Sequence, residues 1–315
     1  MDVIFMGLSK SGKTSIKKVV FEKMSPHEIF LDPTTSIESF KVENLGYSSL
    51  MVRDFPPNFN FDKAPQTELK YFSTCAVLIY VLDCQDTNEE TYDYFKEVVI
   101  NALNKNPKIS IEVFINKADG AYYLKTNEMN KNRSEVQTKI KDILNELQIE
   151  VNVGFYSTSI YDHSLFEAFS KIFQKIMPQN GFLSSLLDNL STSCRFEKAY
   201  LFDVYNKIYL AIDSSPMEEQ FYEICSDMTD VVLDMSGIYG EAINNDIFFD
   251  ENSYSLIKIS NNSRSENSKS LLYLRFIDTN LALISIINEE NFERQHLIDY
   301  NIKLFKEAVK EILKS

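Results

Sequence analysis

The feature that most constrains this chain is an eight-residue motif near its start, Gly7-Leu8-Ser9-Lys10-Ser11-Gly12-Lys13-Thr14. It matches the pattern G-x-x-x-x-G-K-[S/T] and lies between a short apolar run and a helical pattern. Glycines let such a loop wrap around phosphate oxygens, while its backbone N–H groups and the helix N-terminus supply positive potential. The motif therefore predicts a strand, a phosphate-binding loop and a helix in succession.

Two residues of this loop have specific expected roles. We expect Lys13 to reach the β and γ phosphates of a nucleotide and Thr14 to offer its hydroxyl to Mg²⁺. The remaining residues predicted to bind the nucleotide here are Ser9, Lys10, Ser11, Gly12 and Ser15. A phosphate loop alone does not separate ATPases, kinases and GTPases, so the choice depends on the base site.

A second motif, Asn116-Lys117-Ala118-Asp119, follows the apolar run 111–115. It thus lies at the carboxyl end of a predicted strand, where open α/β sheets bind ligands. A fixed carboxylate there accepts hydrogen bonds from N1–H and the exocyclic amine of guanine, whereas adenine has no matching donors. We expect Asp119 to set the choice of base, Lys117 to pack over the ring plane and Asn116 to brace the loop. Thr158-Ser159-Ile160, after the next strand, is placed to touch the guanine edge, through Ser159 and Ile160.

Residues 2–177 alternate β-rich apolar runs with helical patterns, which is the signature of a doubly wound α/β sheet. The expected strands span 3–6, 37–42, 49–53, 76–82, 111–115 and 151–156, and predict a mostly parallel six-stranded sheet. The expected helices lie near 13–22, 89–103, 134–147 and 164–176. Right-handed crossovers would place the functional loops at the carboxyl ends of the strands.

The second half of the chain has a different pattern. Pro178 and the Gln-Asn-Gly run after it predict the end of a helix and a domain boundary, with domains over 1–178 and 182–315. The expected elements are a helix at 183–190, strands at 198–204 and 207–212, a helix at 216–236, strands at 255–259, 271–277 and 281–287, and a helix at 290–313. This order predicts an α+β domain with an antiparallel sheet. The Ser- and Asn-rich segment 260–270 is expected to be a hairpin loop without a function.

Composition excludes several classes of partner. The formal net charge of −14 argues against a duplex nucleic acid partner and disfavours direct adsorption to an anionic membrane. No apolar run reaches the roughly 18 residues of a membrane span, and the first residues read as a strand rather than a signal peptide, so we expect a cytoplasmic protein. Position 2 is not glycine and no C-terminal prenylation box is present, so membrane attachment would need a partner. The four widely spaced cysteines predict buried thiols in a reducing compartment.

Further motifs in both halves of the chain carry a family resemblance. They are Met6-Gly7-Leu8, Lys18-Val19-Val20-Phe21, Thr158-Ser159-Ile160-Tyr161-Asp162-His163-Ser164, Phe166-Glu167-Ala168-Phe169-Ser170, Glu197-Lys198-Ala199-Tyr200-Leu201-Phe202-Asp203-Val204, Asp213-Ser214-Ser215-Pro216 and Asp230-Val231-Val232. In these motifs the chain resembles the Rag family of GTPases, specifically its C/D-type branch, over nearly its whole length.

The resemblance implies a P-loop small GTPase domain that binds GTP or GDP with Mg²⁺, followed by a roadblock/longin-like domain over 182–315. It also implies a heterodimer with an A/B-type Rag GTPase through the C-terminal domain. A scaffold complex would hold this pair peripherally on the lysosome or vacuole, where it would recruit TOR complex 1 when amino acids are plentiful. In this family the C/D-type subunit favours the active state when it carries GDP.

The resemblance further assigns the switch residues. Thr34 or Thr35 would meet Mg²⁺ and the γ phosphate, and the match around Phe30-Leu31 favours Thr34. Asp54, which ends a predicted strand, would hold Mg²⁺ through water. The predicted metal residues are therefore Thr14, Thr34 and Asp54.

The segment after Asp54 departs from the family pattern D-x-P-G-Q, because this chain reads Asp54-Phe55-Pro56-Pro57-Asn58. Pro57 has no N–H to donate to the γ phosphate, and losing one charge-assisted hydrogen bond should weaken the preference for GTP by roughly 1.5 to 3 kcal/mol. Asn58, the candidate catalytic residue, is one methylene shorter than the glutamine that orients the attacking water. We therefore expect slow GTP hydrolysis and a GDP-bound resting state.

Other readings remain. The chain could be an ordinary cycling GTPase in which another donor replaces the lost one, or a scaffold subunit that acts by dimerising. Intact Lys13, Thr14 and Asp119 argue against a complete loss of nucleotide binding. A trafficking GTPase of the Arf or Rab type fits poorly with the second domain and with the absence of a lipid signal.

Overall fold

The computed structural model describes residues 2–29, 34–45, 48–86, 88–119, 126–216, 219–239, 253–260, 269–278 and 280–314. The chain divides into two compact units, Met1–Ala168 and Phe169–Ser315. The division falls inside helix α5 (Ser164–Ile176), and α5 is followed by a break before helix α6 (Asn180–Cys194). The helix end expected at Pro178 is therefore present, while the domain limits 1–178 and 182–315 stay predictions.

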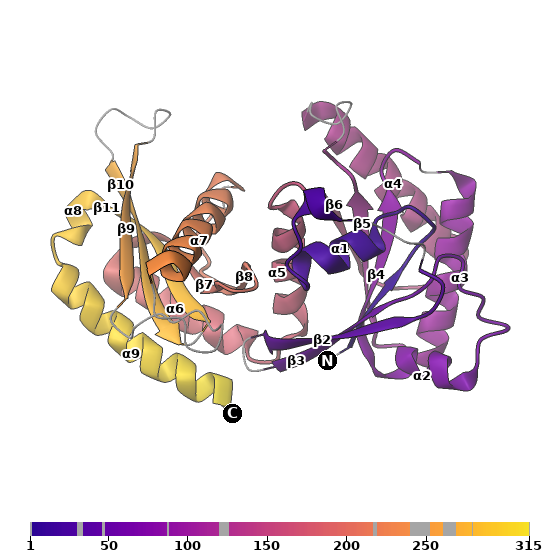
Figure 1. The fold of residues 1–315 in the computed structure, drawn as a ribbon, viewed down its shortest axis with the longest axis horizontal. Helices are drawn as coiled ribbons and strands as arrows, with labels where there is room; N and C mark the ends of the chain where they lie inside the picture. The colour runs from indigo at the N-terminus through magenta and orange to yellow at the C-terminus, as the bar shows by residue number, and fades with distance from the viewer. Residues whose placement is uncertain are drawn as a thin grey trace. The chain divides into compact units, whose positions relative to one another are not determined.

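The first unit is built on a mostly parallel sheet, as the sequence predicted (Figure 1). In the described part of this unit, six strands lie in the order β2-β3-β1-β4-β5-β6, and the antiparallel pair among them is β2 with β3. Their bounds are β1 Asp2–Met6, β2 Glu38–Leu45, β3 Ser48–Asp54, β4 Cys75–Asp83, β5 Ser110–Asn116 and β6 Val153–Thr158. The carboxyl ends of β1, β3, β4, β5 and β6 meet at one edge, which is where the predicted site lies.

The helices of this unit agree with the expected ones except in two places. They are α1 Lys13–Val20, α2 Gln66–Thr74, α3 Glu89–Lys105, α4 Thr126–Glu146 and α5, with a short 3₁₀ turn, η1, at Pro26–Glu28. Helix α4 begins eight residues before the predicted 134. Helix α2 was not predicted, because it is short and has few apolar residues, of which Phe72 is buried and Leu69 and Tyr71 are partly buried.

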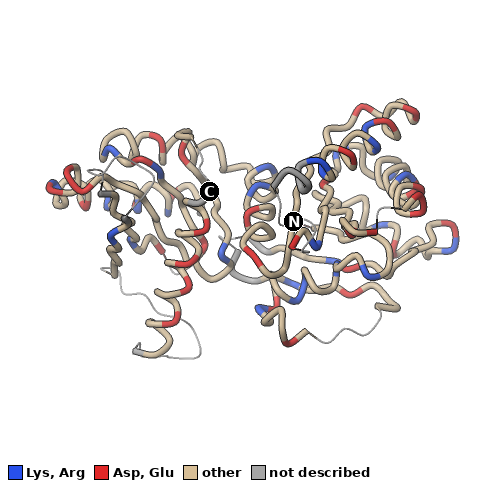
Figure 2. The backbone as a smooth tube through the Cα atoms, turned by 90° about the horizontal axis from the view of Figure 1, so that it is seen from above, with Lys and Arg blue, Asp and Glu red and all other residues tan. Residues whose placement is uncertain are grey.

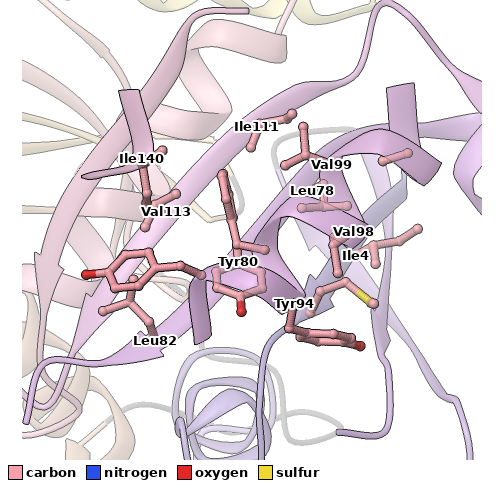
Figure 3. Packing of buried hydrophobic residues seen from close by; sticks show 14 of the residues in the cluster. Ile4, Leu78, Tyr80, Leu82, Tyr94, Val98, Val99, Ile111, Val113 and Ile140 are labelled. Carbon is pink, nitrogen blue, oxygen red and sulfur yellow. The ribbon is translucent and has the colours of Figure 1, made fainter. Parts of the chain in front are cut away.

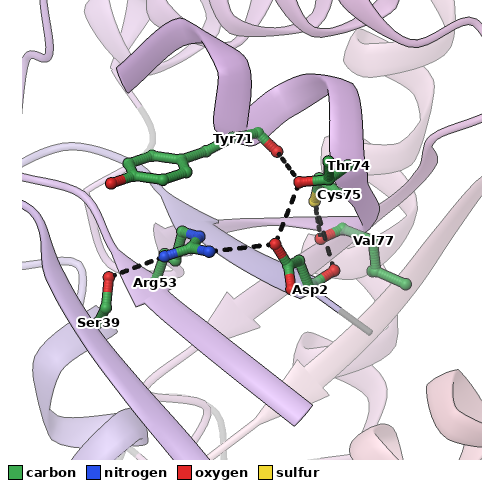
Figure 4. Close-up of polar contacts among 7 residues, drawn as sticks. All are labelled: Asp2, Ser39, Arg53, Tyr71, Thr74, Cys75 and Val77. Carbon is green, nitrogen blue, oxygen red and sulfur yellow. Dashed lines mark hydrogen bonds and ion pairs between the residues drawn. The ribbon is translucent and has the colours of Figure 1, made fainter. Parts of the chain in front are cut away.

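Polar contacts hold α2 against the sheet in addition to the packing of Phe72 in the core (Figure 4). Arg53 on β3 donates to Ser39 Oγ at 2.9 Å and to Asp2 Oδ2 at 3.2 Å, and its guanidinium lies 4.0 Å above the Tyr71 ring of α2. Thr74 at the end of α2 donates to the same Asp2 oxygen at 3.1 Å. Three strands and one helix are thus joined by contacts that a hydrophobic pattern cannot predict.

Strand β4 passes through the centre of the core of the first unit (Figure 3). Leu78, Tyr80 and Leu82 alternate along it and pack with Val98 of α3, all within 1% of complete burial. The Tyr80 hydroxyl donates to Thr91 O at 2.6 Å, so its polar atom is satisfied inside the core. Each such side chain stabilises the fold by about 1.5 to 3 kcal/mol through its burial, which fixes β4 beside β5, the strand that leads into the base loop.

The second unit contains an antiparallel sheet of five described strands in the order β8-β7-β11-β10-β9. Its elements are α6, β7 Phe196–Asp203, β8 Ile208–Ile212, α7 Glu219–Tyr239, β9 Tyr254–Ser260, β10 Lys269–Asp278, β11 Leu281–Asn288, α8 Glu289–Phe292 and α9 Gln295–Lys314. The predicted order of helices and strands is confirmed. The expected final helix is split at residues 293–294, after Asn288 caps α8 by accepting from Glu290 N–H at 2.9 Å. The expected loop at 260–270 lies mostly outside the described residues, between two paired strands.

An ion pair lies inside the second unit. Lys198 Nζ is 2.8 Å from Asp213 Oδ1, with the two side chains 1% and 2% exposed. The same ammonium donates to the carbonyl oxygens of Asp213 and Ser215 at 2.9 and 2.5 Å. The motif at 213–216 is therefore held to β7 by the buried Lys198 ammonium, which contacts one carboxylate oxygen and two carbonyl oxygens.

Charged residues of both signs are interspersed along the described chain (Figure 2). Figure 2 shows Lys and Arg scattered among Asp and Glu, with no continuous basic stripe along the described chain. All four cysteines are described, and each is a buried free thiol. Among the residues that the structure describes, no helix is long and apolar enough to cross a bilayer.

Candidate nucleotide-binding site

The phosphate loop connects β1 to α1, and two glycines make its path possible. Gly7 has a φ of 143°, and a Cβ atom there would lie 2.2 Å from Val81 O. Gly12 has a φ of 102°, and its Cβ would lie 2.2 Å from Asn116 Nδ2. Both contacts are too close for any side chain, so the loop packs directly on β4 and on the base loop.

Lys13 is buried beneath this loop. Its Nζ donates to the carbonyl oxygens of Gly7 and Leu8 at 2.6 and 2.9 Å. Burial lowers the pKa of Lys13 to about 8, against an opposing effect of the Asp54 carboxylate. A phosphate group in the loop would place a negative charge beside this ammonium and favour its protonated form.

The other loop residues are placed as follows. Ser9 and Lys10 are exposed, while Ser11 and Ser15 are buried. Ser11 Oγ donates to Leu8 O at 2.9 Å, which closes the turn. Lys10 has a φ of 61°, so the backbone turns sharply before α1.

Three predicted metal residues come together beside the loop. Thr14 Oγ1 donates to Asp54 Oδ2 at 2.7 Å and lies 3.0 Å from Thr34 Oγ1, whereas Thr35 is exposed. Asp54 is fully buried, and burial raises its pKa, against the effect of the Thr14 hydrogen bond and of Lys13. Its Oδ1 has no hydrogen-bond partner among the described residues. A buried carboxylate oxygen beside two hydroxyls fits a hard cation such as Mg²⁺, which prefers oxygen ligands.

The base loop is joined to the phosphate loop by Asn116. Its Nδ2 donates to Ser11 O at 2.9 Å, and its Oδ1 accepts from Thr158 Oγ1 at 3.2 Å. Asn116 therefore connects β5, β6 and the phosphate loop, which is the bracing position expected for it.

The residues expected to meet the base lie around the exposed Asp119. Asp119 Oδ1 accepts from Ser159 Oγ at 2.7 Å, and Ser159 Oγ in turn accepts from Tyr161 N–H at 3.0 Å. The carboxylate is thereby oriented while it remains open to a ligand. Ile160 is half-buried beside it. Lys117 has a φ of 63°, and its Nζ pairs with Asp83 at 2.5 Å.

Sequence reasoning missed Asp83 and Cys84. Asp83 ends β4 and lies beside Asn116 in the parallel register with β5. Cys84 N–H donates to Asn116 O at 2.9 Å, and Cys84 Sγ donates to Lys117 O at 3.0 Å. The sequence does contain a signal for Asp83. It is a carboxylate at the end of a buried strand, and such strand ends lie at the ligand edge of the sheet.

The segment after Asp54 is anchored by aromatic side chains. The rings of Phe55, Phe59, Phe61 and Phe72 contact one another with centroids 4.9 to 5.6 Å apart. Phe59 N–H donates to the Tyr94 hydroxyl at 2.9 Å. Asn58 lies between these anchors, is exposed, and has a φ of 56°. The structure thus places the candidate catalytic side chain at the surface.

Comparison with known proteins decides between the nucleotide-binding families. Residues 2–229 match the Gtr1/RagA G protein conserved region. The chain belongs to this family. It is 41% identical over 314 residues to Ras-related GTP-binding protein C of Homo sapiens, covering 98% of this chain and 76% of that protein. Identity to GTP-binding protein gtr2 of Schizosaccharomyces pombe is 40% over 318 residues, covering 98% and 97%.

Identity to the other type of subunit is lower. GTP-binding protein GTR1 of Saccharomyces cerevisiae is 24% identical over 313 residues, covering 97% of this chain and 96% of that protein. The chain therefore lies in the C/D branch of the Gtr1/RagA family. As a G protein of this branch, it is a guanine-nucleotide-binding protein of the Rag type.

Proposed function

We propose that this Gtr1/RagA-family chain is the C/D-type subunit of a Rag heterodimer that relays amino-acid sufficiency to TOR complex 1. The observation that carries the nucleotide site is the 2.9 Å hydrogen bond from Asn116 to Ser11, because it ties the base loop to the phosphate loop. One nucleotide can then contact both loops at once. The proposed binding residues are Ser9, Lys10, Ser11, Gly12, Lys13, Thr14, Ser15, Thr34, Asp54, Asn116, Lys117, Asp119, Ser159 and Ile160.

In the phosphate part of the site, Lys13 and the loop N–H groups neutralise the β and γ phosphates. Thr14, Thr34 and Asp54 would hold Mg²⁺, Asp54 through water, and its buried Oδ1 has no other partner among the described residues. When bound, Mg²⁺ would neutralise phosphate charge. In the base part, Asp119 accepts from guanine N1–H and its amine, and Ser159 keeps the carboxylate oriented.

Slow hydrolysis is part of the proposal. Pro57 offers no N–H to the γ phosphate, and Asn58 is exposed in a left-handed backbone conformation between two aromatic anchors. Hydrolysis needs a side chain that orients water at the phosphate, so this arrangement makes turnover slow. Loss of the Pro57 donor weakens GTP binding relative to GDP, and this difference in affinity favours a subunit that rests with GDP.

The second unit is proposed to be a roadblock/longin-like domain that pairs with an A/B-type Rag subunit. Strand β9 is an edge of the described sheet and carries exposed Tyr254 and Leu256. Helix α7 exposes Val231, Met235 and Ile238, which lie on one helical face. Exposed apolar side chains on an edge strand and on a helix are typical of a surface that a partner covers. The pair would be held on the lysosome or vacuole by a scaffold complex.

The test compares nucleotide affinities with and without Pro57→Gly, using the purified chain with its partner. A GDP preference of about tenfold or more, abolished by Pro57→Gly, is the expected result, because glycine restores a backbone donor. Pro57→Ala, which also restores the N–H but allows less backbone freedom, serves as a matched variant. Equal affinities for GDP and GTP in every variant would instead favour an ordinary cycling GTPase.

A further inference from the structure

Asp83 has both carboxylate oxygens fixed at the end of β4. Its Oδ2 accepts from Lys117 Nζ at 2.5 Å, and its Oδ1 accepts from Gln85 N–H at 2.9 Å. The Asp83 side chain is 18% exposed, so the carboxylate has little freedom to reorient. It is an oriented anchor for an ammonium group at the ligand edge of the sheet.

Lys117 is held at both its backbone and its side-chain end. Its φ of 63° is a conformation that residues other than glycine rarely adopt, and its carbonyl oxygen accepts from Cys84 Sγ at 3.0 Å. The side chain is 40% exposed, and yet Nζ is tied to Asp83. Fixing a lysine side chain costs conformational entropy, and here that ordering is present before a ligand binds.

We infer that Asp83 is a positioning residue for guanine. It keeps the Lys117 side chain extended, so that its methylene groups offer an apolar surface to one face of the base. Asp83 acts through Lys117 and does not touch the nucleotide. This inference rests on the proposed function of the base loop, in which Lys117 covers the ring plane.

The measurement is the dissociation rate of fluorescently labelled GDP from the full-length chain. Asp83→Asn removes the charge while Oδ1 can still accept from Gln85 N–H. We expect dissociation to become about fivefold faster, equivalent to about 1 kcal/mol for a partly exposed charged pair. The matched control is Asp86→Asn, which changes the net charge by the same amount. Asp86 is exposed, and its Oδ1 accepts from Asn88 Nδ2 at 3.4 Å. The control should leave the rate unchanged.

A double-mutant cycle separates positioning from general support of the fold. Lys117→Met keeps the apolar stem and removes the ammonium, so Asp83→Asn should add no further acceleration in that background. The inference would be overturned if Asp83→Asn accelerated GDP dissociation by the same factor with and without Lys117→Met. An unchanged rate in Asp83→Asn would overturn it as well. The thermal midpoint of Asp83→Asn should stay that of the parent, and a large fall would show a structural role instead.

Failure of this inference can be told apart from failure of the base site. Lys117→Ala removes the stem itself and should accelerate GDP release more than Asp83→Asn does. If Lys117→Ala has no effect, the proposed base site is wrong and the inference falls with it. If Lys117→Ala accelerates release and Asp83→Asn does not, the inference alone is overturned.

Discussion

At the scale of single residues, the proposed base site makes base choice depend on the chemistry of one carboxylate. Asp119 is exposed and oriented by Ser159, so Asp119→Asn keeps the shape of the side chain and replaces an acceptor by a donor. Xanthine has a carbonyl where guanine has its amine. We therefore predict that Asp119→Asn weakens GDP binding by about 100-fold or more and strengthens binding of xanthosine diphosphate.

Competition titrations with the two diphosphates measure this change. Ser159→Ala is the comparison variant, because it removes the orienting hydroxyl and leaves the carboxylate in place. It should weaken GDP binding several-fold without any gain for xanthine. If Asp119→Asn keeps its preference for GDP, the base is recognised elsewhere.

Lys13 leads to a prediction about protons. Its pKa of about 8 lies below the ordinary 10.5, so between these values the unfolded chain binds more protons than the native one. The contribution of Lys13 to stability of the nucleotide-free protein therefore rises with pH across that window. Phosphates raise the pKa of Lys13, and GDP binding at pH 8 should take up about half a proton.

Calorimetric titrations in two buffers of different ionisation enthalpy give the number of protons taken up. Lys13→Arg, which stays charged at every pH used, should bind GDP with no uptake at pH 8. Equal uptake in both proteins would assign the proton to another group.

At the scale of elements, the hydrophobic pattern predicted the strands that are buried in the core. The strands 76–82 and 111–115 were found within one residue because their apolar runs are buried on both faces. Helix α2 was missed because it is short and has few apolar residues, and because its contacts with Arg53 and Asp2 come from residues distant in sequence. The motifs located the loops of the site, whereas Asp83 and the aromatic anchors depend on register and packing, which no motif records.

The buried pair on β7 gives a prediction at the same scale. Lys198→Met should destabilise the protein by about 3 to 5 kcal/mol, because Asp213 is left charged and buried without its partner. The double variant Lys198→Met with Asp213→Leu should recover most of that loss. Denaturant unfolding followed by circular dichroism reports both. A double variant that is no more stable than Lys198→Met would mean that the hydrogen bonds to Asp213 O and Ser215 O carry the effect.

At the scale of the whole molecule, two units with separate cores predict separable functions. A chain shortened to residues 1–181 should bind GDP and lose its pairing with the A/B-type subunit, if 182–315 form the dimerisation domain. Size-exclusion chromatography with light scattering measures the pairing, and labelled GDP measures the binding. Pairing that persists without 182–315 would move the interface to the first unit.

The aromatic anchors after Asp54 have a consequence for how such a sequence can change over evolutionary time. Phe55, Phe59, Phe61 and Phe72 pack on one another, and Tyr94 accepts from the Phe59 backbone, so these contacts hold the segment on both sides of positions 57 and 58. Substitutions that fit the backbone at these two positions, including the left-handed conformation of Asn58, can therefore accumulate while the fold is maintained. A lineage can in this way lose rapid GTP hydrolysis and still keep an intact surface for binding its partner proteins.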